Sequence, residues 1–141
     1  MPDHGKQALP LSVAIVCKNN ESTIGRVLDS VAGIAGEIVA LDSGSTDQTI
    51  PMLESAGARV ERVQWQGHKR TKQMALEACT KAWILCVDSD EYVDAELAAA
   101  IAEAVTRDDP LVAAYRVNRK VLYDGELLHH AWQPEPRTRL V

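Results

Sequence analysis

Between residues 11 and 107 the sequence alternates between short apolar runs and segments with helical periodicity. The runs at 11–17, 37–41, 58–63 and 83–87 have the length of buried strands rather than of helices. Each is followed by a segment in which apolar residues recur at helical spacing, around 24–31, 45–57, 69–80 and 95–107. This alternation predicts an α/β fold with a mostly parallel sheet flanked by helices on both faces.

The pattern changes after Pro110. Two further strands are expected at 112–117 and 120–123 with no long helix between them, and 126–141 has no clear periodicity. With 141 residues, 46% of them hydrophobic, the chain is long enough for one domain with a real core. We therefore predict a flexible leader at 1–10, an α/β domain at 11–110, and a short β-hairpin and loop region at 111–141.

Charge and cysteine usage limit the classes of partner. The net charge of −5 argues against nucleic acid as the main partner. No apolar run reaches the ~20 residues that would span a bilayer. Cys17, Cys79 and Cys86 have no metal-binding spacing, and reduced, buried thiols are the expected state. These features predict a cytoplasmic protein.

Polar clusters follow the ends of all four predicted strands. In parallel α/β sheets, ligands bind at the carboxyl ends of the strands, which share one edge. A site at that edge would combine the clusters at 18–21, 42–44, 66–68 and 88–91.

The cluster that follows the fourth strand contains Asp88-Ser89-Asp90. Two carboxylates two residues apart in extended chain point the same way. They are suited to hold a hard cation, Mg²⁺ or Mn²⁺, which can neutralise charge on a leaving diphosphate. A solvated acidic turn is the alternative, and the preceding buried strand favours the metal site.

The cluster after the second strand permits two interpretations. Ser45 and Gln48 fit a capping box that opens a helix, although Pro51 either bends that helix or delays its start. Gly44 lets the backbone approach a ligand closely. Capping does not explain Asp42, whose carboxylate can accept the imide N–H of a uracil ring. Further along, Lys69, Arg70 and Lys72 either meet phosphates or form a solvated helix face.

The wording of these segments resembles the family 2 glycosyltransferases of the GT-A fold. The similar stretches are 12–16 with Asn20-Glu21, 38–47 with its DSGSTD, and 83–91 with its DSDE. The variants DSGSTD and DSDE are similar to the branch that includes lipopolysaccharide core glucosyltransferases, which 115–140 resembles more loosely.

The resemblance implies roles for individual residues. The implied nucleotide-sugar-binding residues are Cys17 (through its backbone), Asn20, Glu21, Asp42, Gly67, Gln73, Asp88 and Ser89. Asp90, with Asp88, would bind the metal. Met74 stands where relatives commonly carry Asn, which removes one expected side-chain contact.

The acceptor side is less complete. The resemblance makes 111–141 the start of an acceptor-side region that is cut short, and the family's usual base motif is absent. Glu135 is the remaining candidate base, with an exposed loop carboxylate as the alternative. His129 and His130 either line the acceptor side or belong to a loop, and Trp132 either stacks on a sugar or closes a hairpin.

These implications favour an enzyme that moves a hexose from a UDP-sugar to a glycan or lipid-linked acceptor in cell-envelope polysaccharide synthesis, with inversion. The alternative is a truncated domain that binds nucleotide-sugar and metal without turnover. A sugar nucleotidylyltransferase needs a Gly-rich loop after the first strand, and 17–21 contains no Gly. Basic residues in the tail suit anionic phosphates or lipid headgroups at the inner membrane face, with a solvated surface as the alternative; these are Arg116, Arg119, Lys120, Arg137 and Arg139.

Overall fold

The computed structural model describes residues 9–119, 122–123, 126–127 and 135–141, with side chains for 9–117 and 139–141. Four strands and four helices alternate in the first part of the chain: β1 (Leu11–Cys17), α1 (Ile24–Val31), β2 (Glu37–Asp42), α2 (Thr49–Ser55), β3 (Arg59–Arg62), α3 (His68–Ala78), β4 (Trp83–Cys86) and α4 (Ala95–Arg107). The later strands are β5 (Tyr115–Arg119), β6 (Leu122–Tyr123), β7 (Glu126–Leu127) and β8 (Glu135–Leu140).

The main sheet has six strands in the order β3-β2-β1-β4-β8-β5, while β6 and β7 form a separate pair. Pairing is parallel from β3 to β4 and antiparallel where β8 joins β4 and β5. The predicted fold class, a mostly parallel sheet with flanking helices and a β-rich C-terminal part, is confirmed.

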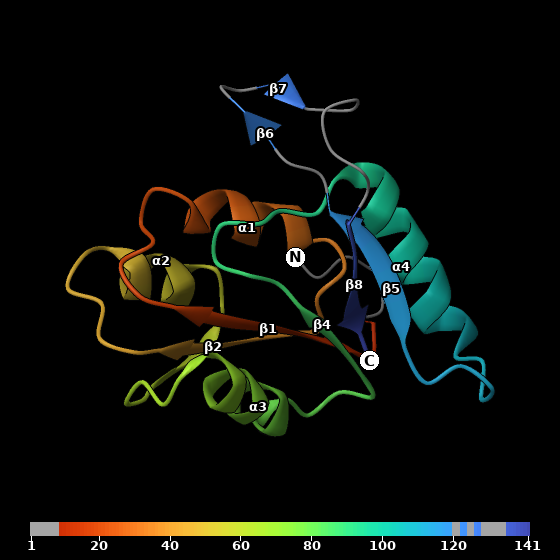
Figure 1. Ribbon diagram of the computed structural model, residues 1–141, viewed down its shortest axis with the longest axis horizontal. Helices are drawn as coiled ribbons and strands as arrows, with labels where there is room; N and C mark the ends of the chain where they lie inside the picture. Colours follow the sequence, from red (N-terminus) through yellow and green to blue (C-terminus); the bar gives the residue numbers. More distant parts are fainter. Residues whose placement is uncertain (1–8, 120–121, 124–125, 128–134) are drawn as a thin grey trace, which may run out of the picture.

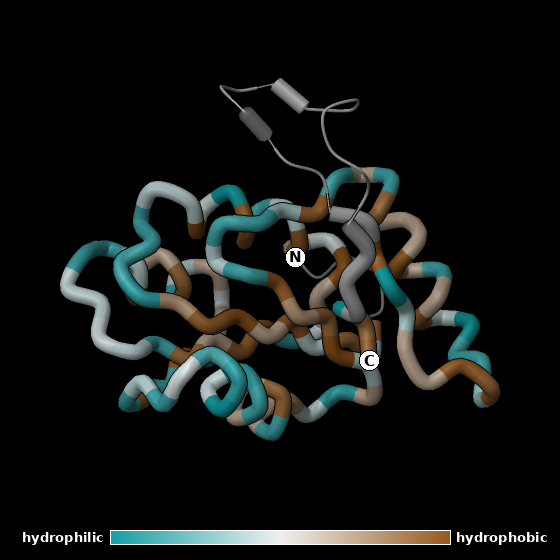
Figure 2. The backbone as a smooth tube through the Cα atoms, viewed as in Figure 1, coloured by the Kyte–Doolittle hydropathy of each residue, from teal (hydrophilic) through white to brown (hydrophobic). Residues whose placement is uncertain are grey.

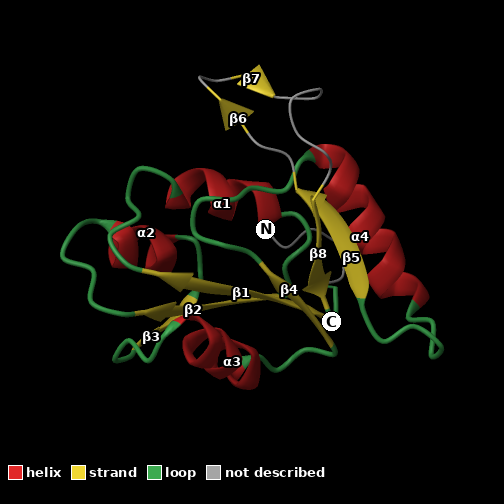
Figure 3. Ribbon diagram, viewed as in Figure 1, coloured by secondary structure: helices red, strands yellow, loops and turns green. Residues whose placement is uncertain are grey.

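Helices cover both faces of the sheet, as Figure 3 shows. The larger core lies on the face of α1, α2 and α4, where the buried side chains of α1 recur at helical spacing as Ile24, Val27, Leu28 and Val31. On the other face, Ala75 of α3 packs against Ala14 and Leu41. β1 is buried almost throughout, so its continuous apolar run has no polar face, as Figure 2 makes visible.

Three helix ends follow the sequence closely. The Asp94 side chain accepts a 2.8 Å hydrogen bond from the Leu97 N–H, which caps α4. Asp108 ends α4 in the left-handed conformation, at φ 45°. Gly57 follows α2 at φ 83°, a backbone conformation that a glycine adopts without strain.

The predicted capping box at Ser45 is wrong. α2 begins at Thr49, and no side chain caps it from Gln48. Ser45 donates its hydroxyl to the Asp42 carboxylate instead, and Asp47 accepts hydrogen bonds from the amide and hydroxyl of Thr49. Pro51 therefore lies in the first turn, where its missing N–H costs nothing.

The tail was expected to lack regular structure beyond 126, and it contains β7 and β8. β8 inserts between β4 and β5 and so belongs to the main sheet. The expected strand at 112–117 begins later, at Tyr115, and of the one expected at 120–123 the described residues Leu122–Tyr123 form β6.

Candidate functional site

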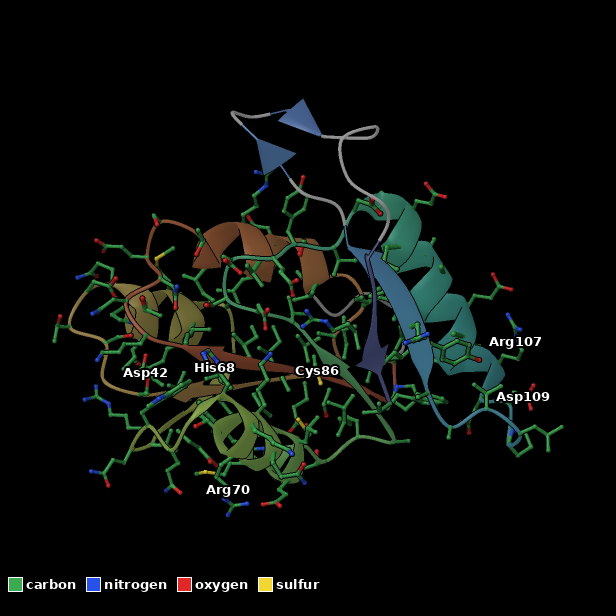
Figure 4. All side chains as sticks on the ribbon, in the orientation of Figure 1. Asp42, His68, Arg70, Cys86, Arg107 and Asp109 are labelled. Carbon is green, nitrogen blue, oxygen red and sulfur yellow. The ribbon has the colours of Figure 1, made fainter. Side chains whose placement is uncertain are left out.

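The predicted site edge exists because β1 to β4 run parallel. The register pairs Cys17 of β1 with Asp42 of β2, and Asp42 with Arg62 of β3, so these strands end side by side. β4 adjoins β1 on the other flank. Asp42 and His68 lie at this end of the molecule, whereas Arg107 and Asp109 lie at the opposite end (Figure 4).

The loops after β1 and β2 are fastened to each other by side chains. The Asn19 backbone N–H donates to Ser45 Oγ at 2.7 Å, and the Asn19 side-chain Oδ1 accepts the Thr46 N–H at 2.8 Å. Glu21 Oε2 accepts the Gln48 N–H at 3.1 Å. Because both loops belong to the same edge, these bonds give a ligand a preformed wall.

Asn20 and Glu21, predicted to bind the nucleotide, both make bonds within the protein. Asn20 Oδ1 accepts the Lys18 N–H at 2.8 Å, and the Asn20 N–H donates to Thr49 Oγ1 at 2.8 Å. The structure places these residues at the site edge as loop-forming groups, and direct contact with a nucleotide stays a prediction.

The Asp42 carboxylate lies beneath the second loop and is only 1% exposed. Its Oδ1 accepts the N–H groups of Gly44 and Ser45 at 2.9 and 2.8 Å, and its Oδ2 accepts the Ser45 hydroxyl. Burial alone would raise the pKa of Asp42, but the Ser45 and Gly44 hydrogen bonds outweigh it and hold that pKa below its ordinary value. Asp42 therefore stays ionised and shapes the loop.

The Cys17 thiol points at this carboxylate, with Sγ 3.6 Å from Asp42 Oδ2. Burial, reinforced by the Asp42 charge, raises the pKa of Cys17 to about 12, so the thiol is an unreactive donor. The Cys17 carbonyl, predicted to meet the base, accepts the Ser43 N–H at 3.1 Å.

A hollow of about 550 Å³ opens between the 42–45 loop and the 62–65 segment that follows β3. Trp65 borders it with 46% of its surface exposed, and its ring meets His68 edge-to-face at 4.9 Å. Gly67 precedes α3 at φ 87°, which explains a glycine there without a ligand contact. Neither Trp65 nor Arg62 was predicted as a site residue. The position of Trp65 just after a strand end could have indicated its place at the site.

Asp88 lies on the other flank of β1, and its carboxylate is held by two cations. Asp88 Oδ1 is 3.0 Å from Lys72 Nζ on α3 and 3.5 Å from the Arg139 guanidinium on β8. Burial would raise the pKa of Asp88, yet Lys72 and then Arg139 hold it below the ordinary value. Of the alternatives for Arg139, the solvated surface is wrong, because Arg139 is 9% exposed and paired with Asp88 and Glu91.

In the rest of the acidic turn, Ser89 and Glu91 make hydrogen bonds within the protein and Asp90 is exposed. The Ser89 carbonyl accepts the Thr23 hydroxyl at 2.8 Å, which fixes the turn to the loop after β1. The Glu91 carboxylate closes the turn by accepting the Asp88 N–H at 2.9 Å. Asp90 is exposed, so the two carboxylates of the motif have different environments.

The donor set fits a divalent cation that is shared with a ligand. Among the described residues, no three His, Cys, Asp or Glu side chains converge to enclose an ion by themselves. Mg²⁺ is commonly held by one or two carboxylates together with substrate phosphates and water, and an exposed Asp90 beside Asp88 meets that requirement.

This edge therefore has two separate candidate binding places, which we call stations: the hollow lined by residues 42–45 and 62–65, and the acidic turn at 88–91. The hollow is bordered by β2 and β3, and the acidic turn follows β4, with β1 between them. β2 and β4 lie two strand spacings, about 10 Å, apart across the sheet. The separation is comparable with the distance from the base to the diphosphate of a nucleotide.

Two other predicted residues are not gathered into either station. Gln73 is exposed on α3, where its amide donates to Glu77 at 3.4 Å. The Glu135 side chain lies outside the described side chains, and His129, His130 and Trp132 lie outside the described residues.

Comparisons with known proteins agree with this geometry. LpsC of Rhizobium meliloti, a lipopolysaccharide core biosynthesis glycosyltransferase, is 36% identical over 132 residues, covering 90% of this chain and 47% of that protein. The chain thus spans about half the length of this relative. TarS 1-349 of S. aureus in complex with UDP-GlcNAc superposes with a TM-score of 0.57 at 27% identity, over 69% of this chain and 31% of that one.

Glucosyl-3-phosphoglycerate synthase of Mycobacterium tuberculosis, crystallised with UDP, superposes with a TM-score of 0.50 at 32% identity, over 59% of this chain and 34% of that one. The sequence profile of glycosyl transferase family 2 matches residues 12–140. With a match over nearly its whole length and polar groups gathered at the carboxyl ends of its parallel strands, the chain belongs to glycosyl transferase family 2.

Proposed function

We propose that the chain is the donor-binding part of a glycosyltransferase that moves a hexose from a UDP-sugar to a glycan or lipid-linked acceptor in cell-envelope polysaccharide synthesis, with inversion. The observation that carries the proposal is that the hollow and the acidic turn lie at the same edge of one sheet, on either side of β1. The UDP-bound structures of TarS and glucosyl-3-phosphoglycerate synthase support the choice of donor, and the name of LpsC supports the choice of pathway.

The stations would divide the donor between them. The base would enter the hollow beside Trp65, against the loop that Asp42 shapes. The diphosphate would reach the acidic turn, where Lys72 supplies positive charge and Asp90 an open carboxylate. A bound Mg²⁺ or Mn²⁺ would neutralise the charge that develops on the leaving diphosphate. Glu135 remains the candidate base for the acceptor hydroxyl.

Calorimetric titration with UDP, with and without Mn²⁺, tests the donor assignment. The native chain should bind UDP more tightly with Mn²⁺, and Asp90→Ala should lose most of that enhancement because the exposed carboxylate is removed. Asp109→Ala is a matched control at the opposite end of the molecule, where Asp109 accepts the Leu111 N–H at 2.9 Å. Equal enhancement in the native chain and Asp90→Ala would exclude Asp90 from the metal site.

The same geometry would serve a domain that binds the donor without transferring sugar. Incubation with UDP-hexose and Mn²⁺ separates the two functions, because an enzyme releases UDP and a binding domain returns the donor intact. A donor that binds but is never consumed would support the second function for this chain.

Among the described residues, no helix is both long and apolar enough to cross a bilayer. Location in the cytoplasm stays a prediction from the cysteine usage and the lack of a long apolar run, and peripheral contact at the inner face of the membrane stays a prediction from the basic tail. Arg139 cannot contribute to such a contact, because it is buried.

A further inference from the structure

Arg139 is a buried charge that pairs with two carboxylates of the acidic turn. With 9% of its surface exposed, its guanidinium has lost most of its water, which is costly unless anionic groups replace it. Nη1 lies 3.5 Å from Asp88 Oδ1 and Nη2 lies 3.2 Å from Glu91 Oε2. Arg139 thus bridges both ends of the acidic turn.

Sheet pairing fixes this position. β8 runs antiparallel to β4 with Leu140 opposite Leu85, and Ile84 and Val141 exchange backbone hydrogen bonds of 2.7 and 2.9 Å. The residue before Leu140 is thereby brought beside the chain just beyond β4, as the adjacent β4 and β8 in Figure 1 illustrate.

The contacts of Arg139 control the shape of the turn. Glu91 uses Oε1 to accept the Asp88 N–H while Oε2 meets Arg139. The guanidinium therefore holds the group that closes the turn as well as the carboxylate that begins it. Ser89 and Asp90 lie between these two fixed points.

Charge balance adds a second consequence. The 88–91 turn carries three carboxylates, and Arg139 contacts two of them, Asp88 and Glu91. Without Arg139, part of the positive charge that offsets the repulsion between these carboxylates would be lost.

We propose that Arg139 is a positioning residue of the donor site, which holds the 88–91 turn in the shape that presents Asp90 to the metal and diphosphate of a bound donor. It acts through Asp88 and Glu91 and touches no ligand itself. This inference rests on the proposed function, because it assumes that a diphosphate binds at the turn.

The test compares Arg139→Met and Arg139→Lys with a matched control, Arg59→Met. Arg59 also bridges two carboxylates, Glu37 at 3.3 Å and Glu61 at 2.8 Å, but at the amino end of the parallel strands, away from the site. UDP affinity with Mn²⁺ is measured by calorimetry below the unfolding transition of each variant, and each thermal unfolding temperature is recorded.

Arg139→Met should weaken UDP by about tenfold or more, the scale of a lost charge-assisted hydrogen bond. Arg139→Lys should restore part of the affinity, since it keeps the charge but not the two-pronged geometry. Arg59→Met should lower the unfolding temperature and leave UDP affinity unchanged. Native affinity in folded Arg139→Met would overturn the inference.

A second readout separates this inference from the proposed function. Hydrogen exchange at the Asp88 amide reports the bond to Glu91 whether or not UDP binds. Exchange should accelerate in Arg139→Met and not in Arg59→Met. A native chain that binds no UDP refutes the proposed function, and unchanged exchange at Asp88 in Arg139→Met refutes the positioning role.

Discussion

At the scale of single residues, Asp42 concentrates several hydrogen bonds on one buried carboxylate. Gly44, Ser45 and the thiol of Cys17 all donate to it, and its pKa stays below the ordinary value despite its burial. Gly44 adopts φ 125°, so the chain can double back over the carboxylate. The charge of Asp42 is therefore part of the loop's structure before any ligand arrives.

Asp42→Ala should destabilise the protein by about 1 to 3 kcal/mol, because the amides of Gly44 and Ser45 lose their acceptor. It should also weaken UDP equally with and without Mn²⁺, since the hollow is separate from the acidic turn. Urea unfolding and calorimetry measure the two effects. Asp42→Asn is the control, because it keeps one acceptor oxygen for the loop amides. If Asp42 only shapes the loop, Asp42→Asn should bind UDP with near-native affinity. If Asp42 contacts the imide directly, Asp42→Asn and Asp42→Ala should both bind UDP more weakly. Unchanged affinity in Asp42→Ala would remove Asp42 from the base site.

Local sequence could not decide how Ser45 is used. A serine three residues before a glutamine fits a capping box, and the same serine three residues after an aspartate fits a turn that closes on the carboxylate. The choice depends on burial of Asp42 between β1 and β3, which is a property of the sheet. The capping prediction failed for that reason, while the importance of Asp42 was predictable from its position at a strand end.

At the scale of elements, Glu37 ties several of them together at the amino end of the sheet. Its carboxylate at the start of β2 accepts the hydroxyl of Ser12 on β1, and the amide and hydroxyl of Thr80 just before β4. Burial would raise the pKa of Glu37, but the bonds from Ser12 and Thr80, with a further one from Arg59, lower it to about 2.

This low pKa predicts a pH-dependent stability. Because the folded pKa, about 2, lies below the ordinary 4.5, Glu37 stabilises the fold above pH 4.5 and loses that effect as the pH falls toward 2. Glu37→Gln should therefore be less stable than the native chain near neutral pH, by about 1 to 3 kcal/mol, with the gap closing in acid. Urea unfolding at about pH 6 and about pH 3 measures it.

Glu61→Gln is the matched control, because Glu61 meets the same Arg59 on the surface, with 46% of its side chain exposed. Its loss should cost at most about 1 kcal/mol. A gap for Glu37→Gln that persists unchanged in acid would contradict the assigned pKa shift.

The elements that were predicted well are those whose own sequence pattern is enough to identify them as a helix or a strand. α1 and α4 bury a stripe at helical spacing, and β1 is apolar throughout. β8 reads Glu-Pro-Arg-Thr-Arg-Leu, and its place comes from the open edge of β4, far away in the chain. No local pattern carries that information.

At the scale of the whole molecule, Cys17 reports on global opening. It ends the buried strand β1 with 3% of its surface exposed and a pKa raised to about 12 by burial. In a Cys79→Ser, Cys86→Ser background, a thiol reagent at about pH 8 should react only after unfolding. Labelling should slow when UDP and Mn²⁺ are added, because ligand binding stabilises the folded state. Rapid labelling of the folded chain would contradict this burial.

The general placement of the site was predictable from the sequence, because parallel strands must end at one edge. Asp42, Asp88 and Asp90 do lie there. The hollow itself is bordered by Asp42 and not by Asp88, because β1 lies between β2 and β4, so a shared binding site for the three carboxylates stays a prediction. Lys72 was anticipated as a phosphate ligand but not as a partner of Asp88, and Arg139 reaches the turn only through the strand order. The contacts of Lys72 and Arg139 with Asp88 depend on which elements are neighbours in the fold, which the local sequence does not reveal.

The insertion of β8 beside β4 also has a consequence for biosynthesis. Arg139 follows its partner Asp88 by 51 residues, so a ribosome that adds about 5 to 20 residues per second leaves roughly 3 to 10 s between them. Throughout that interval the flank of β4 is a bare edge, open to strands of neighbouring nascent chains. A holdase chaperone that shields this edge should raise the yield of folded chains.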